Sequence, residues 1–392
     1  MVKRRPDLPP RMRGRLARRL TAAAARGQFE LPVCTQCGTV IFPLQEICRH
    51  CLSDRLEWRE VPAVGKLLTR TVIRHSTDAY FQAHRPIQMG TAQLDCGPIV
   101  FAQISPACAQ IGSRVRLFNR LDRGGEQVFV AMPEEAEVEP NIIADPNREV
   151  KGKTVLVTGA DGGLGKALVE AFVKAGAARV WAATRKQVAE DVAEDAVIRP
   201  VRMDVTVIPS VEAAVAATGG EVDILVNNAG VTAISGLLDA ETTEGARQEM
   251  EVNYLGTLNV IRGFAPAMKG RGQGVVVNIL TVLAHANLPS MGSYCASKAA
   301  ALSMTQGVRA ELMPWGVRVA AIFPSTVDTP ASSDSPPPKL RPAQVADAVV
   351  RQILDGMEDV YPGRIASDLY AGWRDSHKVV ERELAMGLPE PR

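Results

Sequence analysis

The sequence has little net charge, no long apolar run and few aromatic residues. Basic side chains exceed acidic ones by only two in 392 residues, so the chain as a whole lacks the charge of a nucleic-acid binder. No stretch approaches the roughly 18 apolar residues of a membrane-spanning helix, so no membrane association is predicted. No apolar core follows the basic N-terminal residues, which argues against a secretory signal peptide. The apolar fraction of 46% is that of a globular protein.

Cysteine is also scarce, and the count of seven is odd, which argues against a disulfide framework. Cys96, Cys108 and Cys295 are isolated, whereas the other four form two close pairs. This distribution predicts a reducing compartment, the cytoplasm, with one metal site.

The chain is too long for one ordinary core, so several domains are expected. Residues 1–20 hold eight basic side chains against one acid, Asp7. An Arg-rich, acid-poor leader can be an organelle transit peptide, but a basic helical arm, solvated or docked on a partner, is the favoured interpretation. The alanines within residues 11–28 favour a helix. We therefore predict a basic helical arm over residues 1–30.

The paired cysteines have the spacing of a zinc ribbon. Each Cys-x-x-Cys turn supplies two thiolates, and the ten residues between the pairs let a hairpin return the second pair to the first. A redox Cys-x-x-Cys is the alternative, but two such pairs close together favour a metal. Four protein ligands leave no open position, so the zinc is predicted to be structural and His50 a bystander. The predicted ligands, within a ribbon at residues 31–60, are Cys34, Cys37, Cys48 and Cys51.

Residues 61–132 contain short β-rich runs punctuated by glycine and proline, as in a small barrel. The acidic, proline-containing segment 133–150 has little periodicity and is predicted to be a linker. The predicted strands of the barrel are Val61–Ile73, Met89–Leu94, Ile99–Ile104, Val115–Leu121 and Gln127–Met132.

Residues 10–132 resemble the zinc-ribbon/OB-fold family that accompanies thiolases and other acyl-CoA enzymes. The resemblance rests on the basic arm, the cysteine pairs, the phrase Leu56–Trp58 and the later phrase Ile111–Val115. It implies docking of a thiolase-like partner or binding of acyl-CoA. An OB barrel can also bind nucleic acid through stacked aromatics, but this one offers few. These are chiefly Tyr80, Phe81, Phe101 and Phe118.

After residue 150, Val- and Ile-rich runs alternate with longer helical ones, the pattern of a doubly wound parallel sheet covered on both faces. We predict such a Rossmann-like domain over residues 151–365 and a C-terminal tail over 366–392. Residues 331–339 are too rich in proline and serine for regular structure and are predicted to form a mobile loop. The predicted strands are Thr154–Val157, Val180–Ala183, Val201–Met203, Ile224–Val226, Val275–Ile279 and Val317–Ile322.

A glycine-rich loop joins the first of these strands to a predicted helix at Leu164–Ala175. Glycines let the backbone approach a pyrophosphate, whose charge lies at the helix N-terminus. Its place in a βαβ unit makes the motif specific for a dinucleotide. The candidate binding residues of this loop are Gly159, Asp161, Gly163, Leu164 and Gly165.

The second strand ends at Arg185 without the carboxylate that NAD-selective sites place there for the adenosine ribose. A guanidinium at this point can pair with a 2′-phosphate. We therefore favour NADP(H) over NAD(H); the alternative is that Arg185 is a solvated turn residue.

Tyr294 and Lys298 are four residues apart and lie on one face of a predicted helix. A phenol is a poor base at neutral pH, but a nearby ammonium and an oxidised nicotinamide favour the phenolate. Tyr294 can then donate or accept the alcohol proton while hydride moves.

Residues 151–365 closely resemble the short-chain dehydrogenase/reductase family. Further motifs of that family follow successive strands or lie on the next helix. They are Asp204-Val205, Asn227-Asn228-Ala229-Gly230, Asn253-Tyr254-Leu255-Gly256, Asn278-Ile279-Leu280-Thr281 and Pro324-Ser325-Thr326-Val327-Asp328-Thr329.

The resemblance implies a role for each matching cofactor residue. Asp204 and Val205 would hold the adenine. Asn228, Ala229 and Gly230 would line the cofactor.

It implies roles at the reacting end as well. Asn253 would complete a water-linked proton relay through Lys298, which also grips the nicotinamide ribose. Val327 and Thr329 would meet the carboxamide. Family members form dimers and tetramers through the helices bearing Asn253 and Tyr294, so a homo-oligomer is expected.

The sequence departs from the family at two positions. Thr281 replaces the substrate-orienting serine, and its hydroxyl can still donate to a carbonyl oxygen. Ser325 replaces the glycine after Pro324. Asn227 and Asn278 are interpreted as bridges between strands. His285 lies between Thr281 and Tyr294 and is interpreted as a satisfied or solvent-facing loop histidine rather than an acid.

The fusion itself indicates a substrate class. An acyl-CoA-associated domain joined to a carbonyl reductase predicts interconversion of a 3-oxoacyl-CoA and a 3-hydroxyacyl-CoA beside a thiolase-like partner. One alternative is a reductase of a free ketone whose N-terminal domain serves assembly. Another is a nucleotide-binding scaffold without catalysis, which Thr281 and Ser325 favour slightly and the complete Tyr/Lys/Asn set opposes.

Overall fold

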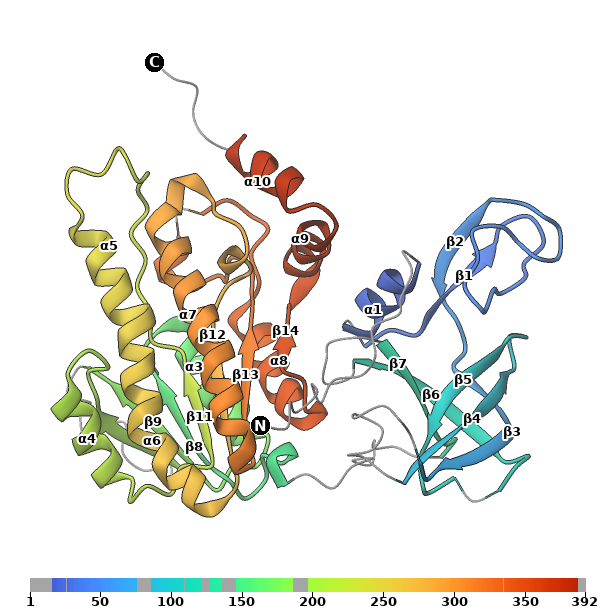
Figure 1. Ribbon diagram of the computed structural model, residues 1–392, viewed down its shortest axis with the longest axis horizontal. Coiled ribbons are helices and arrows are strands. Elements are labelled where there is room, and N and C mark those ends of the chain that lie inside the picture. Colours follow the sequence, from blue (N-terminus) through green and yellow to red (C-terminus); the bar gives the residue numbers. More distant parts are fainter. Residues whose placement is uncertain are drawn as a thin grey trace. The chain divides into compact units, whose positions relative to one another are not determined.

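The computed structural model describes residues 16–386 except 26, 76–85, 109, 122–126, 136–145, 186–196 and 334. The chain divides into two compact units, Met1–Asp145 and Pro146–Arg392 (Figure 1). No helix of the described ranges has both the length and the apolar character needed to cross a membrane.

The first unit begins with a short helix and a two-stranded ribbon. Helix α1 (Ala17–Ala25) is shorter than the predicted arm, and residues 1–15 lie outside the described ones. Strands β1 (Glu30–Cys34) and β2 (Leu56–Glu60) pair antiparallel. The Asn119 side chain donates to the carbonyls of Leu20 and Gln28 at 3.2 and 3.0 Å. These bonds fasten the helix to the barrel that follows.

Five strands close into a barrel, as predicted, in the order β3-β4-β5-β7-β6. Alternate residues point inward, so Leu67, Val100 and Val115 are fully buried. A Cβ added to Gly90 would lie 2.1 Å from the carbonyl oxygen of Thr69, so only glycine allows these two strands to cross so closely. The strands are β3 (Val64–Ile73), β4 (Ile87–Leu94), β5 (Ile99–Ile104), β6 (Arg114–Leu121) and β7 (Gln127–Pro133).

The second unit is built on a parallel sheet of seven strands in the order β10-β9-β8-β11-β12-β13-β14. The reversal of order beside β8 is the switch point at which α/β folds bind their ligands. The six predicted strands are present, and the two-residue β14 is too short to leave a sequence pattern. The strands are β8 (Thr154–Thr158), β9 (Arg179–Thr184), β10 (Ile198–Arg202), β11 (Ile224–Asn227), β12 (Gly274–Ile279), β13 (Val317–Ile322) and β14 (Asp359–Val360).

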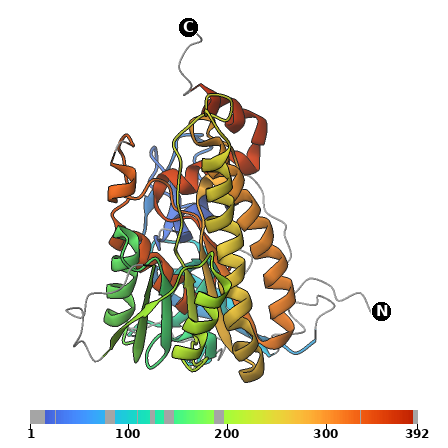
Figure 2. The same ribbon diagram turned by 90° about the vertical axis from the view of Figure 1, so that its left-hand side faces the viewer.

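Helices cover both faces of this sheet (Figure 2). Helix α3 (Gly163–Lys174) packs with α8 (Pro342–Asp355) on one face, and α4 (Ile208–Ala217), α6 (Thr257–Arg271) and α7 (Gly292–Leu312) pack in a row on the other. Helix α5 (Glu244–Glu249) continues through the π-helical turn η3 (Met250–Gly256) into α6. The 3₁₀ turns are η1 (Pro146–Arg148), η4 (Val282–Ala284), η5 (Pro289–Met291), η6 (Met313–Trp315) and η7 (Pro330–Ser332).

The predicted C-terminal tail is wrong. Helix α9 (Gly363–Asp375) contains the predicted boundary at residue 365, and α10 (His377–Ala385) follows it. Ala366 is fully buried in a core cluster, and the Tyr370 ring stacks on Tyr361 at 3.8 Å. Ala366 packs with Leu280 and Val282, which are far away in the sequence, so no local pattern predicts that contact.

The predicted linker is too long at its C-terminal end. The side chain of Asn147 donates to the Gly316 carbonyl at 2.9 Å and accepts from the Gly274 amide at 2.8 Å. Asn147 therefore already belongs to the second unit, which begins at Pro146. Residues 333 and 335–339, which follow η7, form no helix or strand, and the Lys339 ammonium donates to the carbonyls of Ser332 and Ser333. The expected mobility of this loop stays a prediction.

Candidate active site and metal centre

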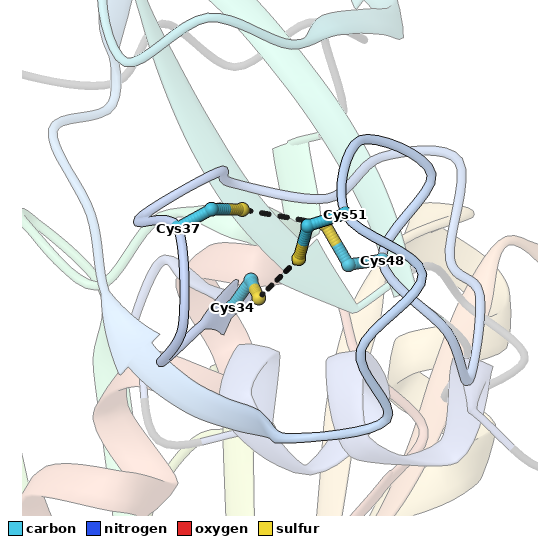
Figure 3. A group of neighbouring side chains, drawn as sticks. All are labelled: Cys34, Cys37, Cys48 and Cys51. Carbon is cyan, nitrogen blue, oxygen red and sulfur yellow. Dashed lines mark hydrogen bonds between the residues drawn. The ribbon is translucent and has the colours of Figure 1, made fainter.

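The four paired cysteines come together at the tip of the first unit (Figure 3). Their sulfur atoms all lie within 4.8 Å of one another. The Cys34–Cys51 and Cys37–Cys48 sulfur pairs are 3.5 and 3.6 Å apart. Thiolates bound about 2.3 Å from a tetrahedral zinc would be about 3.8 Å apart, so the set fits that ion.

The chemistry of the cluster also favours a metal. The hydroxyl of Thr39 lies 3.2 Å from the sulfur of Cys37, and this bond, together with one from the Thr39 backbone, lowers the pKa of Cys37 to about 5. In the chain alone the Ser53 backbone lowers the pKa of Cys51, but burial and the neighbouring thiols outweigh it and raise that pKa to about 12, so it is the positive charge of a metal that would make all four sulfurs thiolates. The thiolate is the form that binds zinc. His50 is exposed and does not belong to the cluster, as predicted. All four positions are filled by protein, so the metal would hold the ribbon together rather than bind a substrate.

The glycine loop between β8 and α3 is tightly packed. A Cβ at Gly165 would lie 2.1 Å from the carbonyl oxygen of Gly159, and one at Gly163 would lie 3.0 Å from Cγ2 of Thr329. Gly159 itself has φ of +62°. No side chain caps the start of α3, so its amide groups are available to a phosphate. Among the other predicted loop residues, Asp161 is exposed and Leu164 half-buried.

The segment after β11 supports this loop. The side-chain amide of Asn228 donates to the carbonyls of Thr158 and Gly159 at 2.9 and 3.2 Å. The Thr158 hydroxyl in turn accepts from the amides of Asn228 and Ala229, both at 2.9 Å. Asn228 therefore fixes the shape of the cofactor cradle through hydrogen bonds to the chain itself.

Arg185 and Asp204 lie together at the other end of the cradle. Asp204 accepts hydrogen bonds from the amide and hydroxyl of Thr206 at 3.0 and 2.7 Å. Partial burial raises the pKa of Asp204, but the bonds from Thr206 and the charge of Arg185 outweigh it and hold that pKa below its ordinary value. Val205 is buried beside them. The guanidinium of Arg185, the residue after β9, therefore lies near Asp204 at the end of the cradle expected to hold the adenosine.

The residues predicted to be catalytic converge at the carboxyl ends of the strands. Lys298 donates to the Ile279 carbonyl at 2.9 Å, and its ammonium lies 5.9 Å from the ring centroid of Tyr294. A Cβ at Gly230 would lie 3.1 Å from Oδ1 of Asn253 and 3.5 Å from Nζ of Lys298. Three separate predicted motifs therefore meet at one point.

The side-chain amide of Asn253 makes three hydrogen bonds within the chain. It accepts from the Val231 amide, donates to the Val231 carbonyl and donates to the Ser297 hydroxyl, each at 2.9 Å. It lies in the π-helical turn η3, and π-turns frequently mark functional positions. These contacts make Asn253 a clamp on the segment after Gly230; its part in a water-linked relay stays a prediction.

Burial moves the pKa values of the Tyr294–Lys298 pair in opposite directions. It raises the pKa of Tyr294, with the charges of Cys295 and Glu249 adding to the effect, and lowers the pKa of Lys298 to about 8. The chain alone therefore keeps Tyr294 protonated, the form that donates a proton. The phenolate needs the added positive charge of an oxidised nicotinamide.

Thr281 is buried at the end of β12. Its hydroxyl donates to the Pro324 carbonyl and accepts from the Leu283 amide, both at 3.3 Å. These long bonds are weak, so the hydroxyl can turn toward a substrate oxygen. Thr329 makes a capping box with Ser332, which orders the segment facing the glycine loop.

Asn227, Asn278 and His285 have the structural contacts that the sequence analysis expected of them. The buried Asn227 amide donates to the Asn278 side-chain oxygen at 2.8 Å and so bridges β11 and β12. His285 hydrogen-bonds to the Tyr361 hydroxyl at 3.0 Å, and burial lowers its pKa to about 4. It is a satisfied histidine. The sequence reasoning missed Glu249, a buried acid for which a single glutamate in a helix gives no signal.

The comparisons with known proteins agree with this geometry. Residues 153–339 match the short chain dehydrogenase family. Residues 21–57 match the ChsH2 rubredoxin-like zinc ribbon domain, and residues 58–119 match the ChsH2 C-terminal OB-fold domain. An uncharacterised oxidoreductase of Staphylococcus saprophyticus is 33% identical over 214 residues, which cover 52% of this chain and 91% of the relative.

Solved structures are similar over the second unit. A short chain dehydrogenase from Burkholderia cenocepacia in complex with NADP is 41% identical, with a TM-score of 0.57, and covers 62% of this chain and 100% of that one. A short chain dehydrogenase/reductase from Burkholderia phymatum in complex with NAD is 25% identical, with a TM-score of 0.52, and covers 60% of this chain and 96% of that one. The chain belongs to the short-chain dehydrogenase family, and its second unit is a nicotinamide-dependent oxidoreductase.

Proposed function

We propose that the protein interconverts a 3-oxoacyl-CoA and the corresponding 3-hydroxyacyl-CoA with NADP(H). The convergence of Tyr294, Lys298 and Asn253 beside the glycine cradle carries the redox part of the proposal. The fusion to a zinc-ribbon/OB-fold unit, a kind of domain that accompanies acyl-CoA enzymes, supports the thioester.

In the reductive direction the bound cofactor supplies the hydride to the carbonyl carbon. The Tyr294 hydroxyl gives its proton to the carbonyl oxygen as that charge develops. Thr281 donates a hydrogen bond to the same oxygen. Lys298, held against the Ile279 carbonyl, stabilises the phenolate left on Tyr294.

NADP(H) is the proposed cofactor because Arg185 lies at the adenosine end of the cradle. A guanidinium there pairs with a 2′-phosphate. The relative from Burkholderia cenocepacia was solved with NADP, which supports the same choice.

The N-terminal unit is proposed to dock a thiolase-like partner or the CoA moiety, with zinc as its structural metal. A homo-oligomer is proposed through the outer faces of α6 and α7. There a groove of about 690 Å³ offers apolar surface to a second copy. It is lined by Tyr254, Leu258, Ile261, Met304, Val308 and Leu312, with other residues of the same helices.

The test is turnover of the purified protein with NADPH and a panel of substrates. Acetoacetyl-CoA and bulkier aryl or steroid 3-oxoacyl-CoA esters are compared with the free ketones. We expect turnover of at least one thioester; turnover of free ketones alone would contradict the substrate class. Deletion of residues 1–140 distinguishes an acyl-CoA reductase from a free-ketone reductase whose N-terminal domain serves only assembly. The free-ketone reductase would keep its kinetics after the deletion.

A further inference from the structure

The carboxylate of Glu249 is buried beside the catalytic helix, and no cofactor motif accounts for it. Glu249 ends α5 and is 1% exposed. Its Oε1 accepts a hydrogen bond from the Ala233 amide at 2.6 Å. Its Oε2 is buried and has no hydrogen-bond partner among the residues that the structure describes. Burying an unpaired carboxylate oxygen costs stability, so packing alone does not account for a glutamate at this position.

Glu249 and Asn253 grip the same segment. They are four residues apart on adjoining helical turns, and Asn253 binds both backbone groups of Val231 while Glu249 binds the amide of Ala233. A Cβ at Gly245, one turn before Glu249, would lie 3.2 Å from Cβ of Ala233. The segment therefore rests directly on this face of the helix, and it begins immediately after Gly230.

The charge of Glu249 also reaches the proton donor. Helix α5 packs against α7, which carries Tyr294. Of the described ionisable groups, Cys295 on α7 and Glu249 on α5 raise the pKa of this phenol, and the ammonium of Lys298 lies 5.9 Å from its ring centroid. The ammonium favours the phenolate, whereas the carboxylate opposes it and adds to the effect of burial on the pKa of Tyr294.

We infer that Glu249 is a positioning residue that fixes Val231–Ala233 and, through its negative charge, holds Tyr294 in the protonated form that reduces a carbonyl. The inference rests on the proposed redox function. In that step the phenolic O–H bond breaks as the alcohol O–H bond forms, and the carbonyl carbon gains a hydride from the reduced nicotinamide, which is oxidised. Oxidation of the alcohol runs in reverse and needs the phenolate, so Glu249 moves its onset to higher pH.

The experiment compares Glu249→Gln with Glu251→Gln. The first keeps an oxygen acceptor for the Ala233 amide and removes the charge; the second removes the same charge from an exposed position two residues further along the chain. The rising limb of kcat/KM against pH is measured for 3-hydroxybutyryl-CoA with NADP⁺. We expect that limb to move down by about one pH unit in Glu249→Gln and to stay in place in Glu251→Gln.

An unmoved limb in Glu249→Gln, or an equal loss of rate at every pH, overturns the inference and leaves Glu249 a structural residue. Glu249→Met serves in its place if the glutamine variant does not fold. A second measurement needs no turnover: the ultraviolet difference absorbance of phenolate is titrated with NADP⁺ bound, and Tyr294→Phe assigns the signal. If the wild type leaves every thioester untouched, the substrate proposal fails while this titration still decides the role of Glu249.

Discussion

Tyr294 and Lys298 are one helical turn apart, and burial pushes the phenol toward its protonated form and the amine toward its neutral form. The protonation states of Tyr294 and Lys298 therefore depend on the charge of the cofactor that binds beside them. An oxidised nicotinamide adds the charge that lets the phenolate form, so proton transfer is coupled to the redox state of the cofactor. At this scale the protein supplies the geometry and the cofactor supplies the final electrostatic change.

Removal of the Tyr294 hydroxyl tests the proton step. We expect Tyr294→Phe to lose at least about 100-fold in kcat, because general acid–base catalysis typically contributes that much or more. Cofactor affinity, followed by NADPH fluorescence, should be nearly unchanged. Tyr254→Phe, in the groove between α6 and α7, is the matched control and should keep wild-type kinetics. Wild-type kcat in Tyr294→Phe would contradict the assignment.

Removal of the Arg185 guanidinium tests cofactor choice. Arg185→Ala should raise KM for NADPH by about tenfold or more, the value of a charge-assisted hydrogen bond to a 2′-phosphate, and leave KM for NADH nearly constant. Arg179→Ala, at the opposite end of the same strand, should change neither. An equal effect of Arg185→Ala on both cofactors would mean that the residue does not read the phosphate.

At the scale of elements, α9 is held by aromatic packing around His285. The imidazole lies within 5.0 Å of Phe323 and Tyr370, ring centroid to ring centroid, and within 4.9 Å of Trp373. Because His285 caps η4, which follows Thr281 directly, the cluster ties the C-terminal helices to the expected reacting end of the site. Helix α9, which the sequence analysis assigned to a tail, therefore packs behind the segment that carries Thr281.

This cluster predicts a pH dependence of stability. The folded pKa of His285, about 4, lies below the ordinary value of 6.5, so the unfolded chain binds the proton more readily between these values. Stability is therefore complete above about pH 6.5 and falls as pH drops toward 4, by up to about 3 kcal/mol.

His285→Phe keeps an aromatic ring and removes the titration, so its thermal midpoint should fall less steeply over that range. Substitution of the exposed His377 by Gln serves as the control and should follow the wild type. The same slope in His285→Phe and wild type would exclude this histidine as the source.

At the scale of the whole molecule, the two units have separate cores. The barrel core includes Leu67 and Val115, while the sheet core includes Leu156 and Phe264. The zinc cluster belongs only to the first, where β1 and β2 share a small apolar centre around Ile41. A ribbon with so little core depends on its metal for stability.

Loss of the metal should therefore affect the units unequally. Chelation of the metal or Cys48→Ser is expected to remove the thermal unfolding transition of the first unit in calorimetry. The unfolding transition of the second unit should remain. Cys96→Ser, which lies outside the cluster, is the control. Loss of both transitions together would show that the units fold as one.

The sequence by itself determined the order of zinc ribbon, barrel and parallel-sheet unit, the four cysteines of the cluster, and which residues meet beside the glycine loop, whose catalytic and binding roles stay predictions. Periodic Val and Ile runs specified six strands of the sheet, and the spacing of Tyr294 and Lys298 placed them on one helix face, because these signals are local. Only the tertiary structure decided that Asn147 belongs to the second unit, that α9 packs on His285 and that Glu249 is buried. Each of these depends on contacts between residues far apart in the chain, and no local pattern encodes such partners.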